Sequence, residues 1–151
     1  MTNSNQDFEW IIEKLPYGEP FLFVDTITEI TDTYIIGTYT FKKESYFYSG
    51  HFPGKPITPG VILTECAAQI GLVCFGLYTL GPDVPDLSFA FTQSQMDFYK
   101  PVQPGETIRV RGEKVYFRFS KLKCNVVLYN KSNETVARGC LSGMISNERK
   151  V

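Results

Sequence analysis

The sequence predicts an α+β fold in which a curved antiparallel sheet of about six strands is wrapped round one long central helix. Runs with the alternation and the β-branched and aromatic residues of strands stand on both sides of residues 61–80. That segment is apolar at nearly every position, which is typical of a helix buried on all sides. Because the chain has 151 residues, 43% of them hydrophobic, we expect residues 1–151 to form a single domain with a sizeable core.

The N-terminal part of the chain is expected to form a short helix, a hairpin and a loop. Residues 8–14 show a short helical pattern, which Leu15-Pro16 ends. Residues 21–30 and 34–41 are rich in Phe, Val, Ile, Thr and Tyr and flank a polar turn, so we expect them to pair as strands. Residues 44–60 are expected to form a long loop, because their prolines and glycines break both helix and strand.

The rest of the chain is expected to supply the central helix and the remaining strands. The helix covers residues 61–80 and stops at Gly81-Pro82. The strand-like runs that follow it are 87–99, 107–119, 122–129 and 135–145. We expect the two ends of the chain, residues 1–6 and 147–151, to be flexible.

Charge and cysteine content exclude several classes of function. A formal net charge of −1 and a pI near 5.8 provide no global attraction to nucleic acid or to an anionic membrane. The N-terminus has neither the basic nor the apolar region of a secretion signal, so we expect no export. The four cysteines lack metal-ligand spacing and the chain has one histidine. We therefore expect reduced core thiols in a cytoplasmic protein and no metal site.

Residues 61–80 also raise the question of a membrane span, because no other stretch is long and apolar enough. The segment contains an acid, Glu65, in addition to several other polar residues. A charge at the centre of a membrane helix costs about 2.5–3.5 kcal/mol on insertion scales. A buried core helix is therefore the preferred interpretation, and we expect no membrane span.

Two titratable side chains are the strongest indication of function. His51, the only histidine, stands in a Pro/Gly-rich loop, and Glu65, the only acid of the apolar segment, follows fourteen residues later. An imidazole, with an ordinary pKa of about 6.5, acts as base or acid near neutrality. A carboxyl group among apolar neighbours keeps its proton more readily than one in water. The pair therefore predicts a site in which one group takes a proton and the other donates one.

Two further residues beside this pair fit the same chemistry. Gln69 lies four residues after Glu65 on the same helical face, where its amide can hydrogen-bond the carboxyl group. Gly60 stands where the loop becomes the helix, so its backbone N–H is unpaired at the positive end of the helix dipole. A thioester carbonyl that develops negative charge is stabilised at such a place. The alternatives are a structural glycine and a polar pair that satisfies itself in the core.

Three motifs carry a resemblance to a known family. The stretch Gly50–Gly71, GHFPGKPITPGVILTECAAQIG, closely resembles the signature of the FabZ-type 3-hydroxyacyl-acyl-carrier-protein dehydratases, which have the hot-dog fold. The resemblance extends upstream to Leu15-Pro16 and Pro20–Asp25, and downstream to Tyr99–Val102 and Pro104-Gly105-Glu106. The motifs follow the order of the family and cover most of the chain.

The resemblance implies a hot-dog domain that removes water from a (3R)-hydroxyacyl thioester and forms the trans-2-enoyl product without a metal or an organic cofactor. It makes His51 the base at C2 and Glu65 its acidic partner, and it assigns the thioester contact to Gly60. The full set of site residues is the catalytic pair His51 and Glu65, the substrate-binding residues Gly60, Phe52 and Pro59, and Gln69 in support.

The resemblance also implies two partners and no nucleic acid. One partner is the acyl carrier protein that carries the thioester. The other is a second copy of the chain, because the histidine and the acid of one site come from different subunits in this family; trimers of dimers are common. The basic residues of the C-terminal half either meet the acidic carrier or form a solvated sheet face, and they are Lys100, Arg109, Arg111, Lys114, Arg118, Lys121 and Lys123.

Other functions remain open at this point. A hot-dog acyl thioesterase would need a positioned water and usually lacks the His-Phe-Pro-Gly loop. A catalytically silent acyl-binding or scaffold protein would not need both His51 and Glu65. The chain departs from the family pattern at Tyr17, where the family has histidine, and over Glu44–Tyr48. These departures leave open primary fatty-acid synthesis or a specialised pathway such as polyene or aryl-lipid synthesis.

Overall fold

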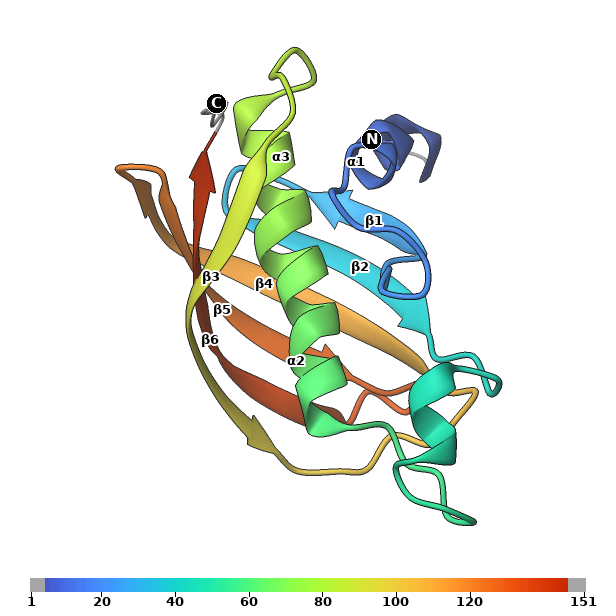
Figure 1. Cartoon of the computed structure of the whole chain (residues 1–151). Helices are drawn as coiled ribbons and strands as arrows, with labels where there is room; N and C mark the ends of the chain where they lie inside the picture. Colours follow the sequence, from blue (N-terminus) through green and yellow to red (C-terminus); the bar gives the residue numbers. More distant parts are fainter. Residues whose placement is uncertain (1–4, 147–151) are drawn as a thin grey trace.

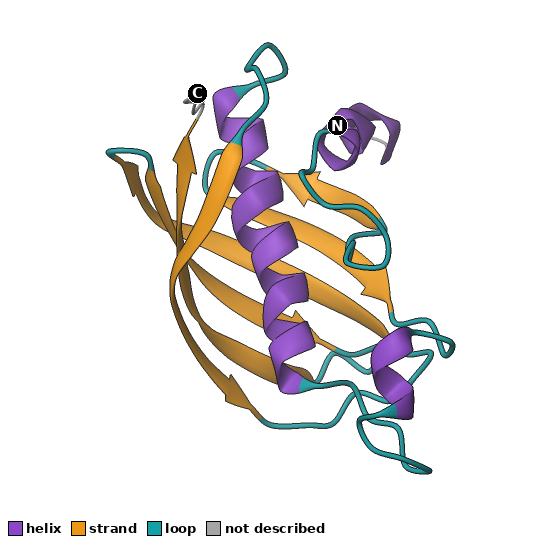
Figure 2. Ribbon diagram, viewed as in Figure 1, coloured by secondary structure: helices purple, strands orange, loops and turns teal. Residues whose placement is uncertain are grey.

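The computed structural model describes residues 5–146 and confirms the predicted α+β fold (Figures 1 and 2). Residues 1–4 and 147–151, which make up most of the two ends expected to be flexible, lie outside the described residues. Asn5 and Gln6 instead open a 3-10 helix, η1 (Asn5–Phe8), which leads directly into α1 (Glu9–Glu13). The short N-terminal helix is thus confirmed, with an earlier start.

The strands form one antiparallel sheet of six strands in the order β1-β2-β4-β5-β6-β3, which curves round the central helix (Figure 2). The last four strands match the predicted ranges to within one residue at each end. The strands are β1 (Thr26–Ile30), β2 (Tyr34–Thr40), β3 (Ser88–Phe98), β4 (Thr107–Arg118), β5 (Lys121–Tyr129) and β6 (Thr135–Ser146). Burial alternates along β5, so that one face of the sheet meets the helix.

The first strand begins later than predicted. The run 21–30 was expected to be one strand, but β1 starts at Thr26. The backbone N–H of Phe23 donates to Oε1 of Gln69 on the central helix over 2.8 Å rather than to a neighbouring strand. Phe23 is buried there, so the segment before Thr26 packs on the helix as an extended loop. Apolar content alone does not separate such a loop from a strand.

One continuous helix crosses the inner face of the sheet (Figure 1), as predicted for residues 61–80. It consists of α2 (Gly60–Ala68), the π-helical segment η3 (Gln69–Cys74) and α3 (Phe75–Leu80). The described residues contain one helix that is long and apolar enough to cross a membrane, and 78% of its most apolar window is buried inside the fold. This burial agrees with the prediction of a core helix.

Glycines set the distance between the helix and the sheet. A Cβ atom at Gly112 of β4 would lie 2.9 Å from Cα of Gly71, closer than real side chains approach a backbone. A Cβ atom at Gly37 of β2 would lie 2.9 Å from Cγ2 of Ile70. The helix therefore rests almost directly on the backbone of the central strands. This contact fixes its position along the sheet.

The cysteines follow the prediction with one correction. All four are free thiols. Cys66, Cys74 and Cys124 are buried, and burial raises their pKa values, that of Cys124 to about 12. Cys140 is only half-buried, so the prediction of a core thiol is wrong there. It lies on β6 beside exposed Arg138, on the same face of the sheet, where alternation turns every second residue away from the helix.

Candidate active site

The loop that carries His51 is anchored to its surroundings. The region 44–60, predicted to be loop throughout, contains a 3-10 helix, η2 (Tyr46–Ser49). The hydroxyl of buried Tyr48 lies 2.5 Å from Oγ1 of Thr58, so the two ends of the loop are joined. The backbone N–H of Thr58 donates to the carbonyl of Val102 over 2.9 Å. The loop is thereby tied to the segment that follows β3.

The imidazole of His51 is oriented by a backbone carbonyl. Its Nδ1 lies 2.9 Å from the carbonyl oxygen of Ile57, whose N–H donates back to the carbonyl of His51 over 2.9 Å. Because a carbonyl oxygen only accepts, this bond requires the proton on Nδ1. In the neutral imidazole Nε2 is then free to accept a proton. The ring of Phe52 stacks on the imidazole at 4.1 Å and 24°. The loop therefore presents His51 as an oriented base.

His51 opens onto a mostly apolar cleft of about 450 Å³, a volume typical of small-molecule sites. The cleft lies between the loop, the first turn of α2 and the segment after β3. Its lining residues are His51, Phe52, Ile57, Thr58, Gly60, Leu63, Phe98, Tyr99, Lys100, Pro101 and Val102. Lys100 also forms an ion pair of 2.8 Å with Glu134. The cleft suits a substrate that is largely uncharged next to the imidazole.

Gly60 begins α2 within this cleft. The preceding residue, Pro59, is the N-cap with φ −60° and ψ 137°, and its carbonyl accepts from the N–H groups of Ile62 and Leu63, so the N–H of Gly60 at the start of the helix has no acceptor inside it. A Cβ atom at Gly60 would lie 3.2 Å from the ring of Phe98. Glycine therefore keeps the backbone open to a ligand at the positive end of the helix dipole. An oxygen that gains negative charge is stabilised at this position.

Glu65 is held by Gln69, as their spacing predicts. Nε2 of Gln69 donates to Oε1 of Glu65 over 3.1 Å and to the carbonyl of Phe21 over 3.0 Å. Burial raises the pKa of Glu65 above its ordinary range, and the bond from Gln69 opposes part of this rise. Burial and the neighbouring Glu65 charge likewise raise the pKa of the Tyr17 phenol. The carboxyl group thus keeps its proton to a higher pH than an exposed one does.

The predicted residues fall into two groups within one chain. The cleft holds His51, Phe52 and Gly60 with Pro59 beside it as the N-cap of α2, whereas Glu65 and Gln69 lie outside the cleft lining. Helix geometry explains the separation. Glu65 follows Gly60 by five positions, which amounts to a rotation of about 140° beyond one full turn. The carboxyl group therefore faces the segment around Phe21 instead of the cleft.

Sequence reasoning missed most of the residues on the far wall of the cleft. Phe98 was not predicted as a site residue, and Tyr99–Val102 were named only as part of the family resemblance, without a role in the site. They follow His51 by nearly fifty residues, and the bond between Thr58 and Val102 brings them there. The available signal was the resemblance of Tyr99–Val102, directly after a strand-like run, to a family motif.

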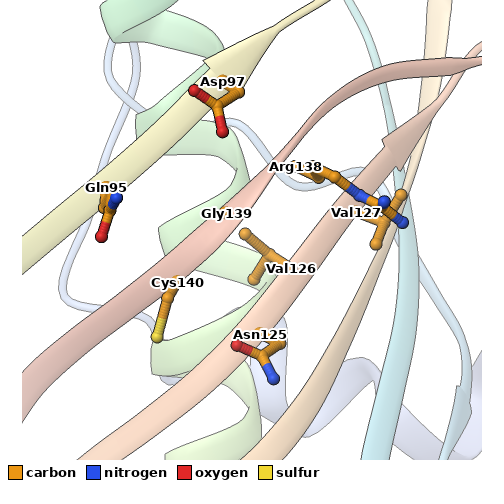
Figure 3. Close-up of a pocket in the computed structure, with 8 residues that line it drawn as sticks. All are labelled: Gln95, Asp97, Asn125, Val126, Val127, Arg138, Gly139 and Cys140. Carbon is orange, nitrogen blue, oxygen red and sulfur yellow. The ribbon is translucent and has the colours of Figure 1, made fainter.

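A second hollow lies elsewhere and contains no predicted site residue (Figure 3). It is lined by Gln95 and Asp97 of β3, Asn125, Val126 and Val127 of β5, and Arg138, Gly139 and Cys140 of β6. Most of these side chains alternate with core residues, so the hollow lies on the outer face of the sheet. Among residues 5–146 no group of three or more His, Cys, Asp and Glu side chains is placed to hold a metal ion.

Solved structures with the same architecture define the class of fold. A hypothetical thioesterase with coenzyme A from Streptococcus pneumoniae matches with a TM-score of 0.58 and 16% identity, covering 97% of this chain and 100% of that one. A sigma28-regulated virulence protein from Campylobacter jejuni matches with a TM-score of 0.70 and 15% identity over 97% and 94% of the two chains. At these identities the likeness shows the fold alone, which is the hot-dog fold.

Sequence comparison then identifies the family. Residues 15–136 match the model of the FabA-like domain. The 3-hydroxyacyl-[acyl-carrier-protein] dehydratase FabZ of Syntrophobacter fumaroxidans is 39% identical over 68% of this chain and 69% of its own. The corresponding FabZ of Wolbachia sp. subsp. Drosophila simulans is 32% identical over 91% and 95% of the two chains. The chain belongs to the FabA-like family, and the two relatives named above are FabZ dehydratases.

Proposed function

We propose that the chain is a (3R)-3-hydroxyacyl-acyl-carrier-protein dehydratase of fatty-acid or fatty-acid-like biosynthesis, a hydro-lyase that forms the trans-2-enoyl thioester. The observation that carries the proposal is the free Nε2 of His51 in an apolar cleft that also contains the first-turn N–H of Gly60. Membership of the FabA-like family supports the same reaction. We further propose a cytoplasmic location, with which the free thiols agree.

The reaction needs a base, an acid and a site for negative charge. Nε2 of His51 accepts the proton from C2 of the substrate while the N–H of Gly60 stabilises the charge on the thioester oxygen. The C3–O bond breaks, a double bond forms between C2 and C3, and Glu65 donates the proton with which the hydroxyl group leaves as water. The proton on His51 then returns to the Glu65 carboxylate, which restores both groups.

We propose that the acid of each site comes from a second subunit. Within one chain Glu65 is turned away from the cleft of His51, so one chain does not complete the constellation. β3 is an edge strand of eleven residues, and its Phe91 and Phe98 are 40% and 47% exposed. A long exposed edge with apolar side chains favours pairing with another chain. The smallest active unit is therefore a homodimer, and a trimer of dimers is the larger assembly to be tested.

The placement of the basic residues supports one contact with the acyl carrier protein. Lys100 is the member of the predicted basic set that lines the cleft. Arg109 and Arg111 instead lie over the rings of Tyr129 and Tyr34, at 4.7 and 4.2 Å from the ring centres, in the sheet. We propose Lys100 as a contact for the acidic carrier that delivers the thioester to the cleft.

The test is an assay of the purified protein with 3-hydroxyacyl thioesters of acyl carrier protein. We expect formation of the 2-enoyl thioester, and losses on the order of 10²-fold or more in turnover for His51→Ala and for Glu65→Gln, with the fold retained. Glu113→Gln, an exposed acid-to-amide change on β4, is the matched control and should retain full turnover.

Three results would contradict the proposal in whole or in part. Release of free thiol without formation of the enoyl product would identify a thioesterase. Binding of the acyl thioester without turnover would identify an acyl-binding protein. Near wild-type turnover in either His51→Ala or Glu65→Gln would disprove the role assigned to that residue.

A further inference from the structure

The turn between β4 and β5 carries the most exposed large apolar side chain among residues 5–146. Phe119 is 92% exposed, and the turn projects beyond the neighbouring strands (Figure 1). Two further apolar side chains are exposed on the adjoining strands, Val115 in the bulge of β4 and Met144, which pairs with Lys121. Exposed apolar side chains are common at protein surfaces, so the conformation of Phe119 decides what its exposure means.

The backbone of this turn is unfavourable for the residues that occupy it. Phe119 and Ser120 have φ angles of 52° and 62°. A two-residue hairpin turn with positive φ at both positions strongly prefers Asn-Gly, Asp-Gly or Gly-Gly, and a bulky residue is an outlier there. The turn is nevertheless held in place, because the carbonyl of Ser120 accepts from the N–H of Ile145 on β6 over 2.8 Å. An aromatic ring that is both strained and exposed indicates that the ring has a function.

Basic side chains surround the turn. Arg118 and Lys121 pair across it, and Lys123 follows on the outer face of β5. Within the described part of the chain, neither lysine forms an ion pair or a side-chain hydrogen bond. Residues 107–129 contain six basic side chains and one acid, Glu113, which leaves this hairpin with a net charge of +5 in a chain of net charge −1. The hairpin is therefore a local positive region that the net charge of the chain conceals.

We propose that the β4–β5 turn docks the protein on an anionic lipid surface, with the Phe119 ring in the interface and Arg118, Lys121 and Lys123 among the headgroups. The ring contributes apolar area, and each basic side chain adds attraction to the negative leaflet. Long basic side chains keep their charge in water while their stems lie along the apolar boundary. Binding through two such signals is reversible, unlike the insertion of a membrane-spanning helix. The inference uses neither the cleft of His51 nor the proposed dehydratase function.

The shape of the turn favours a lipid surface over a second protein. A specific protein interface buries about 800 Å² on each partner, contributed by roughly 20–30 residues. The turn instead presents one protruding ring with a few exposed neighbours. A lipid surface yields around such a ring, whereas a protein needs a pocket of matching shape. An acidic protein would satisfy the basic side chains but would give no reason for a strained aromatic residue at the tip.

Co-sedimentation with lipid vesicles tests the docking. The purified full chain is mixed with vesicles of phosphatidylcholine alone, or of phosphatidylcholine with about 30% phosphatidylglycerol, which supplies the negative charge. We expect binding to the anionic vesicles at about 0.05 M NaCl and release at about 0.5 M, because salt screens exposed charges. Neutral vesicles should retain little protein under either condition.

Phe119→Asn tests the ring without endangering the fold. The substitution removes the aromatic group and introduces a residue that the turn prefers, so the midpoint of urea unfolding should stay unchanged or rise. Affinity for the anionic vesicles should fall about tenfold or more. Tyr46→Asn is the matched control, because Tyr46 is 56% exposed but lies on η2, at the other end of the sheet (Figure 1). Its affinity should equal that of wild type.

Lys121→Gln and Lys123→Gln test the charges. Each substitution removes one positive charge beside the turn, so we expect each to lower the affinity for anionic vesicles about fivefold. Lys131→Gln is the control, because it changes the net charge equally but lies in the turn between β5 and β6, at the opposite end of β5.

Binding that depends on Phe119 and on both lysines, and on neither control residue, would support the inference. Absence of binding to anionic vesicles, or equal losses in the variants and their controls, would overturn it. Full binding of Phe119→Asn would overturn it as well, because the contact would then be adsorption by charge alone. Native mass spectrometry checks the other occupant. An assembly of several copies that Phe119→Asn breaks, in the absence of vesicle binding, would assign the turn to a protein contact and contradict the lipid surface.

Discussion

Gln69→Leu should strongly destabilise the protein, because the Gln69 amide forms three hydrogen bonds inside the fold. Its Oε1 accepts from the N–H of Phe23 at 2.8 Å, and its Nε2 donates to Phe21 and to Glu65. Leucine has nearly the same shape but leaves all three groups without their partner. The buried N–H of Phe23 costs about 1–3 kcal/mol when unsatisfied, and the carbonyl of half-exposed Phe21 costs less because water can reach it. We expect a loss of about 2–4 kcal/mol in the free energy of unfolding.

Urea unfolding of wild-type and variant protein measures this loss. Gln95→Leu is the matched control, because Gln95 is exposed on β3, and its free energy of unfolding should change by less than about 0.5 kcal/mol. Gln69→Leu should also raise the pKa of Glu65, since the hydrogen bond from Gln69 lowers it. A loss no larger than that of the control would show that Gln69 does not hold the loop and the acid in place.

Three other changes have defined outcomes. Burial raises the pKa of Glu65 above the ordinary 4.5, so between these two pKa values the folded state binds more protons than the unfolded state. The contribution of Glu65 to the free energy of unfolding therefore falls as the pH rises from 4.5 through the folded pKa. In denaturant titrations, the free energy of unfolding of Glu65→Gln should therefore rise relative to that of wild type as the pH increases. A difference between the two proteins that does not change with pH would contradict the raised pKa. Gly112→Ala would place a Cβ atom 2.9 Å from the helix backbone and should lower the free energy of unfolding by about 1–3 kcal/mol, whereas Gly18→Ala, with open space around it, should have little effect in the same titration. Tyr48→Phe removes the 2.5 Å hydrogen bond to Thr58 and should raise KM while having little effect on the melting temperature. An unchanged KM would show that this bond does not position the loop that carries His51.

Periodicity and composition predicted most of the fold because apolar and polar residues alternate clearly along the strands after the helix. The range 107–119, for example, corresponds to β4 at 107–118. The error at Phe21–Asp25 has a physical cause, since Phe23 is buried and its backbone N–H bonds to Gln69 of the helix instead of to a neighbouring strand. The π-helical segment Gln69–Cys74 was also not predictable. A change in the number of residues per turn is visible in a sequence only as a shift in the spacing of apolar and polar residues, and a helix that is apolar at nearly every position has no such spacing.

The candidate site was predicted in its residue types and only partly in its arrangement. His51 and Gly60 share a cleft because a short loop joins them, and such local proximity can be inferred from sequence. The far wall at Phe98 and Val102 depends on a long-range backbone bond to Thr58, which leaves no local pattern. The direction of Glu65 follows from helix geometry once the helix start is known.

Mixing two inactive proteins tests the central claim, that His51 of one subunit acts with Glu65 of its partner. His51→Ala and Glu65→Gln chains, unfolded and refolded together in equal amounts, should form heterodimers in half of the molecules. Each heterodimer has one site with both wild-type groups, so the mixture should regain up to about a quarter of wild-type dehydratase activity. No recovery, with heterodimers demonstrated by native mass spectrometry, would mean that each chain builds its own site and would contradict the shared constellation.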